Sequence, residues 1–326
     1  MCHVGVEMQH SGPIACYGRV MRRPALALLL FNLIAVYVLW GSTAPAIRVA
    51  VETLPPWLMA GVRFLIAGTL LWTFVRIRKV VWPTRREWLG AAVTGISLLV
   101  LGNGVFAWTL QYLPASIGAL FFSLAPLFMA FFAFVMYGER LSVLGAVGVA
   151  VGFAGMAYLI VPNGSSALPL VPTIAISLSA VAWALGSVLQ RRFVARNLVQ
   201  ASAMQMLVAG GTLVVLGAIT GERVNLASMT PHAIMAVLYL IGFGSIIGYS
   251  CYLWLMRNVP TTLASTYAYV NPVVAVIISA LLLRETLSMH TIIAAIVIVS
   301  GVALMMLAPK PSHAAQPAHT QVAKIA

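Results

Sequence analysis

The chain has 326 residues, of which 62% are hydrophobic and only 8% are charged. About a quarter of the residues in a soluble domain are charged, so the composition excludes a soluble protein and indicates an integral membrane protein. The net charge of +13 comes from basic residues in short segments between apolar runs, which points to membrane topology rather than nucleic-acid binding.

The first 24 residues are expected to form a cytoplasmic segment. Met21-Arg22-Arg23 precedes the first apolar run, a pattern that a signal peptide would share. The run continues without an A-x-A-like cleavage site, so we interpret it as a retained span and take Met21 as a candidate for the true start. Residues 308–326 are polar and are expected to be a disordered cytoplasmic tail.

Ten apolar runs follow, each close to the roughly 20 residues that a membrane-spanning helix needs. The predicted spans are 25–46, 57–75, 88–109, 114–136, 143–161, 168–189, 199–219, 231–254, 261–283 and 289–307. Prolines and other turn residues punctuate the joins between them. The runs are too long for strands and show no polar alternation, so the sequence predicts an all-α protein with ten transmembrane helices.

One stretch of the sequence occurs twice. Shifting residues 114–160 by 146 positions aligns six pairs of identical residues without a gap. The pairs are Pro114/Pro260, Pro126/Pro272, Glu139/Glu285, Leu141/Leu287, Ser142/Ser288 and Gly155/Gly301. We therefore expect a first five-helix repeat over 25–161 and a second over 168–307. Five is an odd number of spans, so the second repeat must be inverted relative to the first, an arrangement that recurs in secondary transporters.

Basic residues fall almost entirely on one side of the predicted topology. That side holds both termini and the loops after spans 2, 4, 6 and 8, whereas the other holds only Arg48, Arg223 and Arg284. Because basic loops stay in the cytoplasm, both termini are expected inside.

Several motifs resemble those of EamA-type transporters of the drug/metabolite transporter superfamily. They are Trp40-Gly41-Ser42-Thr43, Ala60-Gly61-Val62-Arg63-Phe64, Gly138-Glu139-Arg140-Leu141, Arg284-Glu285-Thr286-Leu287 and Tyr267-Ala268-Tyr269-Val270-Asn271-Pro272-Val273. The resemblance covers about residues 21–308. It implies an inner-membrane carrier that exports small metabolites, amino acids or drug-like compounds.

The candidate substrate-binding residues are polar or aromatic side chains deep in the spans. They are Trp40, Arg63, Asn103, Trp183, Ser187, Tyr267, Tyr269 and Asn271. An unpaired polar group in hydrocarbon costs several kcal/mol, so each polar member must face another helix or a wet cavity. For Ser187, as for Gln205, helix–helix hydrogen bonding is the default. For the deep aromatics, plain packing is the alternative to lining a cavity.

Arg63 lies about six residues, or roughly 9 Å, inside its span. Attraction of an anionic substrate group competes here with snorkelling or binding of helix-end carbonyls, which we rank first. Asn271 precedes Pro272 in the middle of its span, and proline leaves a backbone carbonyl without its hydrogen bond. We therefore expect a kink at Pro272, with the polar side chain of Asn271 beside it. Pro126 repeats that device.

Glu139 and Glu285 lie in turns, each beside an arginine, Arg140 and Arg284 respectively. We interpret these four residues as structural, with each carboxylate pairing with its neighbour and capping the following helix. Proton carriage is the alternative and would place the carboxylates nearer the membrane midplane.

A secondary transporter for small molecules, as monomer or homodimer in the lipid bilayer, is therefore the first functional hypothesis. A passive facilitator or channel is the second. An intramembrane enzyme ranks last, because the chain has no aspartate and no histidine deep in a span, which leaves few catalytic groups. Span 1 has no acidic residue, so we expect no cation exchange through a glutamate there. Cys2, Cys16 and Cys251 lack metal-site spacing, and we expect no cofactor or metal ion.

Overall fold

The computed structural model describes residues 26–139, 141–161, 168–193, 196–258 and 266–308. Within these ranges every regular element is a helix, which confirms the all-helical class. In chain order the elements are α1 (Leu26–Gly41), α2 (Thr43–Ala50), α3 (Pro56–Ile77), α4 (Arg85–Gly95), η1 (Ile96–Gly104), α5 (Val105–Thr109), α6 (Ala115–Phe122), α7 (Ala125–Tyr137), α8 (Val143–Ile160), α9 (Leu170–Leu189), α10 (Leu198–Ile219), η2 (Leu226–Ser228), α11 (Pro231–Tyr239), η3 (Leu240–Ile247), α12 (Gly248–Asn258), α14 (Tyr267–Leu282) and α15 (Met289–Leu307). Elements η1 and η3 are π-helices, and η2 is a 3-10 helix.

Nine stretches of helix in the described ranges are long and apolar enough to cross a membrane. They match nine of the predicted spans to within four residues at each end. The remaining prediction, 261–283, contains the shorter apolar helix Val270–Leu282, and its first five residues lie outside the described ranges. Residues 1–25, with Met21, and the tail from residue 309 also lie outside them. The chain is a multi-pass membrane protein.

Within the described residues, four of the spans depart from regular α-helix. Span 1 breaks between α1 and α2 at Ser42, whose hydroxyl donates to the carbonyl oxygen of Leu39 at 3.1 Å. Span 4 breaks between α6 and α7, and Pro126 stands in the first turn of α7, where its missing N–H is tolerated. Spans 3 and 8 pass through the π-helices, which are often found at functional sites. Helix α14 continues through Pro272, so a hinge role for the two prolines stays a prediction.

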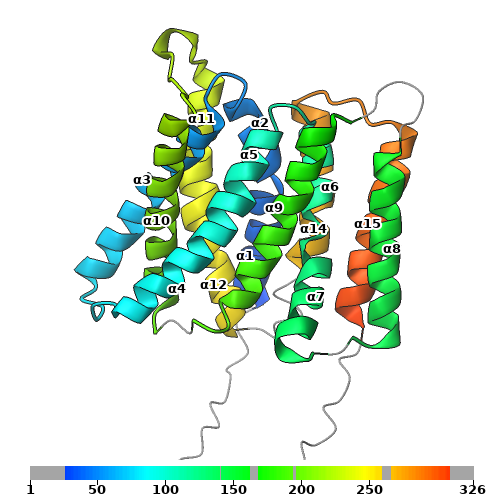
Figure 1. Cartoon of the computed structure of the whole chain (residues 1–326), viewed down its shortest axis with the longest axis horizontal. Helices are drawn as coiled ribbons and strands as arrows, with labels where there is room; N and C mark the ends of the chain where they lie inside the picture. The colour runs from blue at the N-terminus through cyan, green and yellow to red at the C-terminus, as the bar shows by residue number, and fades with distance from the viewer. Residues whose placement is uncertain (1–25, 140, 162–167, 194–195, 259–265, 309–326) are drawn as a thin grey trace, which may run out of the picture.

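Glycines allow two pairs of helices to approach closely. In the pair α3 and α10, a Cβ on Gly61 would lie 3.1 Å from the carbonyl oxygen of Gly210. In the pair α8 and α15, a Cβ on Gly301 would lie 2.4 Å from the backbone nitrogen of Gly152. Neither contact leaves room for a side chain, as is common between membrane helices. Figure 1 shows the two pairs at opposite sides of the bundle, with the other helices between them.

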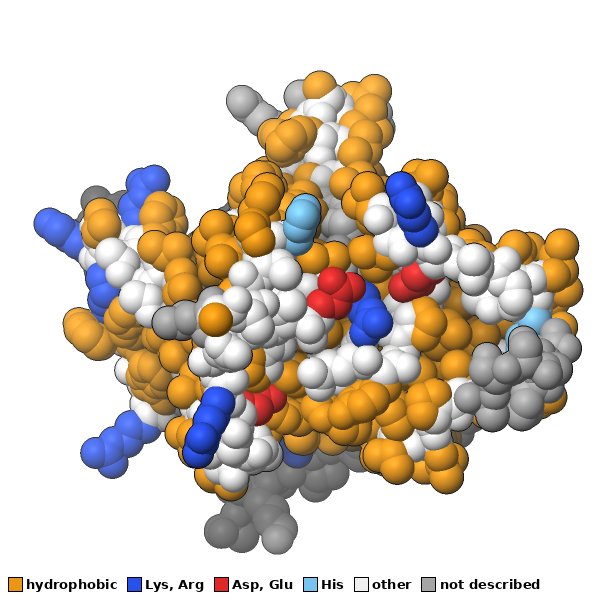
Figure 2. All heavy atoms as spheres, turned by 90° about the horizontal axis from the view of Figure 1, so that it is seen from above, with side chains coloured by type: hydrophobic (Ala, Val, Ile, Leu, Met, Phe, Trp, Pro, Cys, Tyr) orange, Lys and Arg blue, Asp and Glu red, His pale blue; other side chains and the backbone are white. Residues whose placement is uncertain are grey.

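The two ends of the bundle differ in charge. The lower end in Figure 1 contains the turn that joins α3 to α4, the end of α9 and the start of α10. We call this end the basic face; its described basic residues are Arg76, Arg78, Lys79, Arg85, Arg86, Arg191, Arg192 and Arg196. The opposite face carries Arg48, Arg223 and Arg284 among the described residues. Figure 2 looks onto that opposite face and shows acidic and basic side chains close together near its middle.

Candidate substrate site

A cavity of about 540 Å³ enters the bundle from the basic face. Its lining residues come from α4, α10, α12 and the segment after α9; they are Thr84, Arg86, Glu87, Gly90, Ala91, Thr94, Gln190, Arg192, Phe193, Arg196, Leu198, Ala201, Met204, Gln205 and Tyr249. The lining runs along α4 from Thr84 to Thr94, which is roughly 15 Å of helix. The volume is typical of a small-molecule site.

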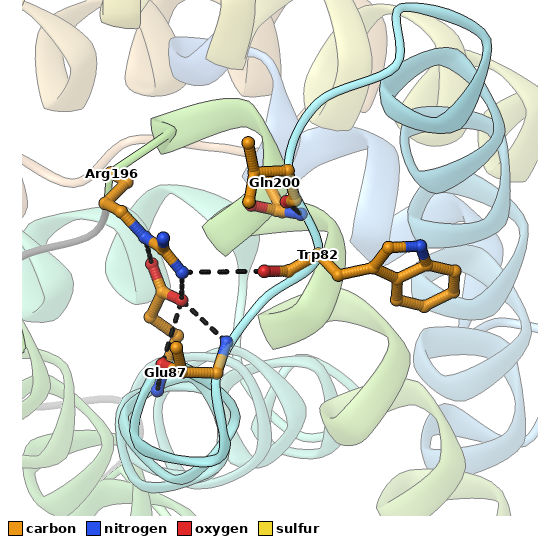
Figure 3. A network of polar contacts seen from close by, with 6 residues as sticks. Trp82, Glu87, Arg196 and Gln200 are labelled. Atoms are coloured by element: carbon orange, nitrogen blue, oxygen red, sulfur yellow. Dashed lines mark hydrogen bonds and ion pairs between the residues drawn. The ribbon is translucent and has the colours of Figure 1, made fainter.

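The mouth of the cavity is held by an ion pair between the two repeats (Figure 3). Arg196 donates from Nε to Glu87 Oε1 at 2.9 Å and from Nη2 to Glu87 Oε2 at 2.7 Å. Glu87 also accepts from the backbone N–H of Thr84 at 2.8 Å. Hydrogen bonding to Glu87, with charge attraction, raises the pKa of Arg196 above its ordinary value. Arg196 therefore stays charged at any physiological pH.

Sequence reasoning missed this pair. Glu87 lies three residues after Thr84, the spacing of a capping box, and the structure contains that box at the start of α4. The pattern could have marked the helix start and the carboxylate. The partner in a distant loop had no comparable signal.

Inside the cavity, Gln205 and Thr94 join α10 to α4. Gln205 Nε2 donates to Thr94 Oγ1 at 2.9 Å, and both residues are buried. The expected helix–helix hydrogen bond of Gln205 is thus observed. Ser187 differs, because its hydroxyl donates to the carbonyl oxygen of Trp183 on the same helix; the interhelical bond expected for Ser187 was wrong.

Four aromatic side chains continue from the inner end of the cavity. Tyr249 lines the cavity and lies 6.1 Å, between ring centroids, from Tyr252. Tyr252 contacts Trp40 at 5.1 Å and Tyr267 at 5.7 Å, and Trp40 meets Tyr267 edge to face at 5.2 Å. We call Trp40, Tyr249, Tyr252 and Tyr267 the aromatic cluster. The structure therefore brings together two of the predicted site residues, Trp40 and Tyr267, from α1 and α14.

Arg63 reaches the same region from α3. Its side chain is only 4% exposed, and its Nε donates to Ser245 Oγ in η3 at 3.1 Å. The neighbouring Gly244 accepts a hydrogen bond from Trp40 Nε1 at 3.2 Å. Arg63 and Trp40 thus meet at adjacent residues of the π-helix. Because Arg63 is buried and donates to the Ser245 hydroxyl, snorkelling does not fit, and no hydrogen bond from Arg63 to a helix-end carbonyl is present among the described residues.

Trp183 belongs to a separate group of aromatic residues. The centroid of its ring lies 5.2 Å from that of Phe122. The ring also packs against Gly102 in η1, where a Cβ would lie 3.1 Å from Trp183 Cε3. Asn103 follows Gly102, and its buried side-chain oxygen has no hydrogen-bond partner among the described residues. Among the described residues, no ring contact or hydrogen bond joins this group to the aromatic cluster.

Asn271 lies on α14 beside the end of α1. Its side-chain oxygen is buried and has no partner in the described part of the chain, while its backbone oxygen would lie 3.2 Å from a Cβ on Gly41. Contact between the Asn271 amide and a ligand stays a prediction. The side chain of Tyr269 and all of Arg140 lie outside the described residues.

At the opposite end of the bundle, two carboxylates bind the starts of helices. Glu285 accepts from the backbone N–H groups of Ala115 at 2.7 Å and Ser116 at 3.1 Å, at the start of α6, and from Ser116 Oγ at 2.6 Å. Glu222 accepts from the N–H groups of Trp57 and Leu58 at the start of α3. Both helices begin after a proline without a side-chain cap, so the carboxylates supply acceptors that the helix starts lack.

The helix capping expected of the two turn glutamates was wrong, and so was the pairing of Glu285 with Arg284, whereas the pairing of Glu139 with Arg140 stays a prediction because Arg140 lies outside the described residues. Glu139 forms a salt bridge with Arg191, and Glu285 binds α6 instead of capping the helix that follows it. The caps of those following helices, α8 and α15, are Ser142 and Ser288. Arg284 is exposed and has a positive φ of 53°, and no described salt bridge joins it to Glu285. A structural role for the turns is compatible with these contacts.

Metal binding finds no support in the described ranges, which contain no group of three or more His, Cys, Asp or Glu residues able to hold an ion.

Comparison with known proteins identifies what the chain resembles. The EamA-like transporter family matches residues 27–161 and again 171–307. The "Uncharacterized inner membrane transporter YedA" of Escherichia coli (strain K12) is 41% identical over 288 residues, which cover 88% of this chain and 93% of that protein. The "Uncharacterized transporter YvbV" of Bacillus subtilis (strain 168) is 27% identical, covering 89% and 94%. A solved structure titled "Crystal structure of protein" is 22% identical with a TM-score of 0.62, covers 86% of this chain and 96% of its own, and shares the fold.

Proposed function

This chain belongs to the EamA-like transporter family, and on that premise we propose that it is a secondary transporter that exports small metabolites or amphipathic compounds by alternating access. The observation that carries the proposal is the cavity, which enters from the basic face and ends at the aromatic cluster. At the opposite end Glu222 and Glu285 bind the starts of α3 and α6, and we infer that these contacts hold that end closed. Such a shape is that of a carrier open to one side.

Reciprocal contacts support an inverted repeat. Gly155 packs on Ile298 and Gly152 packs on Gly301, and the offset of 146 residues turns the first contact into the second. Gly61 with Gly210 and Gly68 with Ala203 are related in the same way by an offset of 142. A two-fold relation between two copies produces such exchanged pairs.

The two deep tryptophans follow the same relation. Trp40 of the first repeat packs on Gly248 of the second, and Trp183 of the second packs on Gly102 of the first. The two glycines are 146 residues apart. Inverted halves that exchange conformations would open the cavity to each face in turn, so in the present conformation we assign the accessible side to the basic face.

Topology follows from the same faces. We propose that the basic face is cytoplasmic, that both termini lie there, and that the protein resides in a bacterial inner membrane, the location named for its Escherichia coli relative. The repeats close a cavity within one chain, so a monomer suffices for transport and a homodimer would place two such units side by side.

Uptake into proteoliposomes tests the function. We expect at least one solute of a metabolite panel to move, and its dependence on an imposed proton gradient separates a coupled carrier from a passive facilitator. The absence of movement for every solute, with and without the gradient, would contradict the transporter proposal.

The cavity itself is tested by narrowing it. Ala201→Phe places a ring into a space of about 540 Å³ and is expected to lower the transport rate about tenfold or more, because such a site must enclose most of its ligand. Val215→Phe on the same helix is the control, because Val215 is 57% exposed and does not line the cavity. Equal rates in the two variants would exclude this cavity as the route.

A further inference from the structure

We propose that Arg63 binds a carboxylate of the transported solute, so that the substrates of this protein are small organic monoanions with an apolar or aromatic body. This inference rests on the proposed transport function and names its substrate class.

Arg63 is a buried cation whose hydrogen-bonding capacity is only partly used. It is 4% exposed, its Nε donates to the neutral hydroxyl of Ser245, and its Nη1 has no hydrogen-bond partner among the described residues. A buried charge without a counter-ion is costly. The ring of Phe64, whose centroid lies 4.9 Å from Arg63 Cζ, offsets part of that cost but carries no formal negative charge.

No acidic side chain described in the structure neutralises it. The chain has no aspartate and six glutamates, of which Glu7 lies outside the described residues. The others are placed elsewhere: Glu52 is exposed, Glu87 and Glu139 pair with Arg196 and Arg191, and Glu222 and Glu285 bind the starts of α3 and α6. The counter-ion of Arg63 must therefore come from outside this set, and a bound solute supplies it.

The surroundings of Arg63 specify the rest of that solute. A Cβ on Gly244 would lie 3.5 Å from Arg63 Nη2, so the residue between Arg63 and Trp40 presents no side chain. Trp40 then leads through Tyr252 and Tyr249 to the cavity. A guanidinium fork suits the planar carboxylate group, and the rings suit an apolar or planar body. One guanidinium and one hydroxyl match a single negative charge rather than a dianion.

Matched pairs of carboxylates and amides test the assignment. Purified protein in detergent is titrated with acetate and acetamide, isovalerate and isovaleramide, and phenylacetate and phenylacetamide, with binding followed by calorimetry. We expect at least one carboxylate to bind about ten- to a hundredfold more tightly than its amide, the scale of a lost charged hydrogen bond. Arg63→Gln should abolish that preference. Equal binding within every pair, or a preference that survives Arg63→Gln, would overturn the proposal.

Arg76→Gln is the matched control. Arg76 lies on the same helix and stacks near Trp72 and Trp82, at 4.8 and 4.5 Å from their ring centroids, but does not line the cavity or touch the aromatic cluster. Its variant should keep the preference. Ser245→Ala leaves the charge in place and should reduce the preference without abolishing it, which guards against misfolding of the Arg63 variant.

The melting temperature without ligand gives an independent readout. Removing an unpaired buried charge should leave the melting temperature of Arg63→Gln unchanged or raised. A clear fall, with the carboxylate preference intact, would assign Arg63 to the fold instead. If proteoliposomes transport the amides but not the acids, the anion site is contradicted while the proposed transport function stands. If the protein binds carboxylates but transports no solute, the transport function is contradicted while the anion site stands.

Discussion

Replacing Gly210 by alanine is expected to lower the free energy of unfolding by about 1–3 kcal/mol, the usual range for overpacking a tight contact. A Cβ at this position would lie 2.7 Å from the backbone nitrogen of Leu65 and 2.9 Å from the carbonyl oxygen of Gly61. Backbone atoms cannot rotate away as a flexible side chain can, so α3 and α10 would have to separate.

The adjacent glycine provides the matched control. A Cβ on Gly211 would meet no atom within 4 Å, and alanine is favoured over glycine in a helix by up to about 1 kcal/mol. Gly211→Ala should therefore leave the melting temperature in detergent unchanged or raise it, while Gly210→Ala lowers it. Equal shifts of the melting temperature in the two variants would show that the two glycines serve to make α10 flexible and not to allow its close contact with α3.

The membrane spans were predictable because bilayer thickness sets their length and prolines or other turn residues interrupt them. Residues 143–161 and 289–307, for example, agree with α8 and α15 to within a residue. Charge counting also separated the two faces. Both signals are local in the sequence or summed over loops, so a single sequence carries them.

Contacts between repeats could not be predicted in the same way. Glu285 stands beside Arg284, and from a sequence alone the adjacent residue is the default partner. In the structure Glu285 instead binds Ala115 at the start of α6, 170 residues away in the chain. One signal was available. Helix α6 begins after Pro114, and proline offers no side-chain acceptor, so its first N–H groups need an acceptor from elsewhere.

The candidate site was predicted in part for a related reason. Depth in a span and chemical type selected Trp40, Arg63 and Tyr267, which lie on or beside the aromatic cluster. Depth alone cannot tell which side of a helix faces the cavity, so Tyr249, Tyr252 and Ser245 were missed and Trp183 fell into a separate group. The π-helix that brings Gly244 and Ser245 to Arg63 has no evident sequence pattern.

Replacing Glu285 by glutamine is expected to open the face opposite the basic face. The carboxylate receives two backbone N–H bonds and one hydroxyl bond, and its charge favours the positive end of α6. Hydrogen bonds to a charged group contribute about 1.5–3 kcal/mol each. Loss of the charge should therefore shift the ratio of closed to open molecules at least about tenfold toward the open form.

Spin labels on Tyr112→Cys and Met289→Cys, in a chain whose native cysteines are replaced by serine, measure that shift. Both positions are exposed, at 54% and 70%, near the start of α6 and at the start of α15. The parent chain should give one short distance, and Glu285→Gln should add a longer one. Glu139→Gln is the matched control from the other repeat, because its salt bridge with Arg191 is half exposed and such surface pairs contribute little. If both variants keep the parent distance, the Glu285 contact is a turn anchor and the closure of this face must come from the packing of α6 against α14 alone.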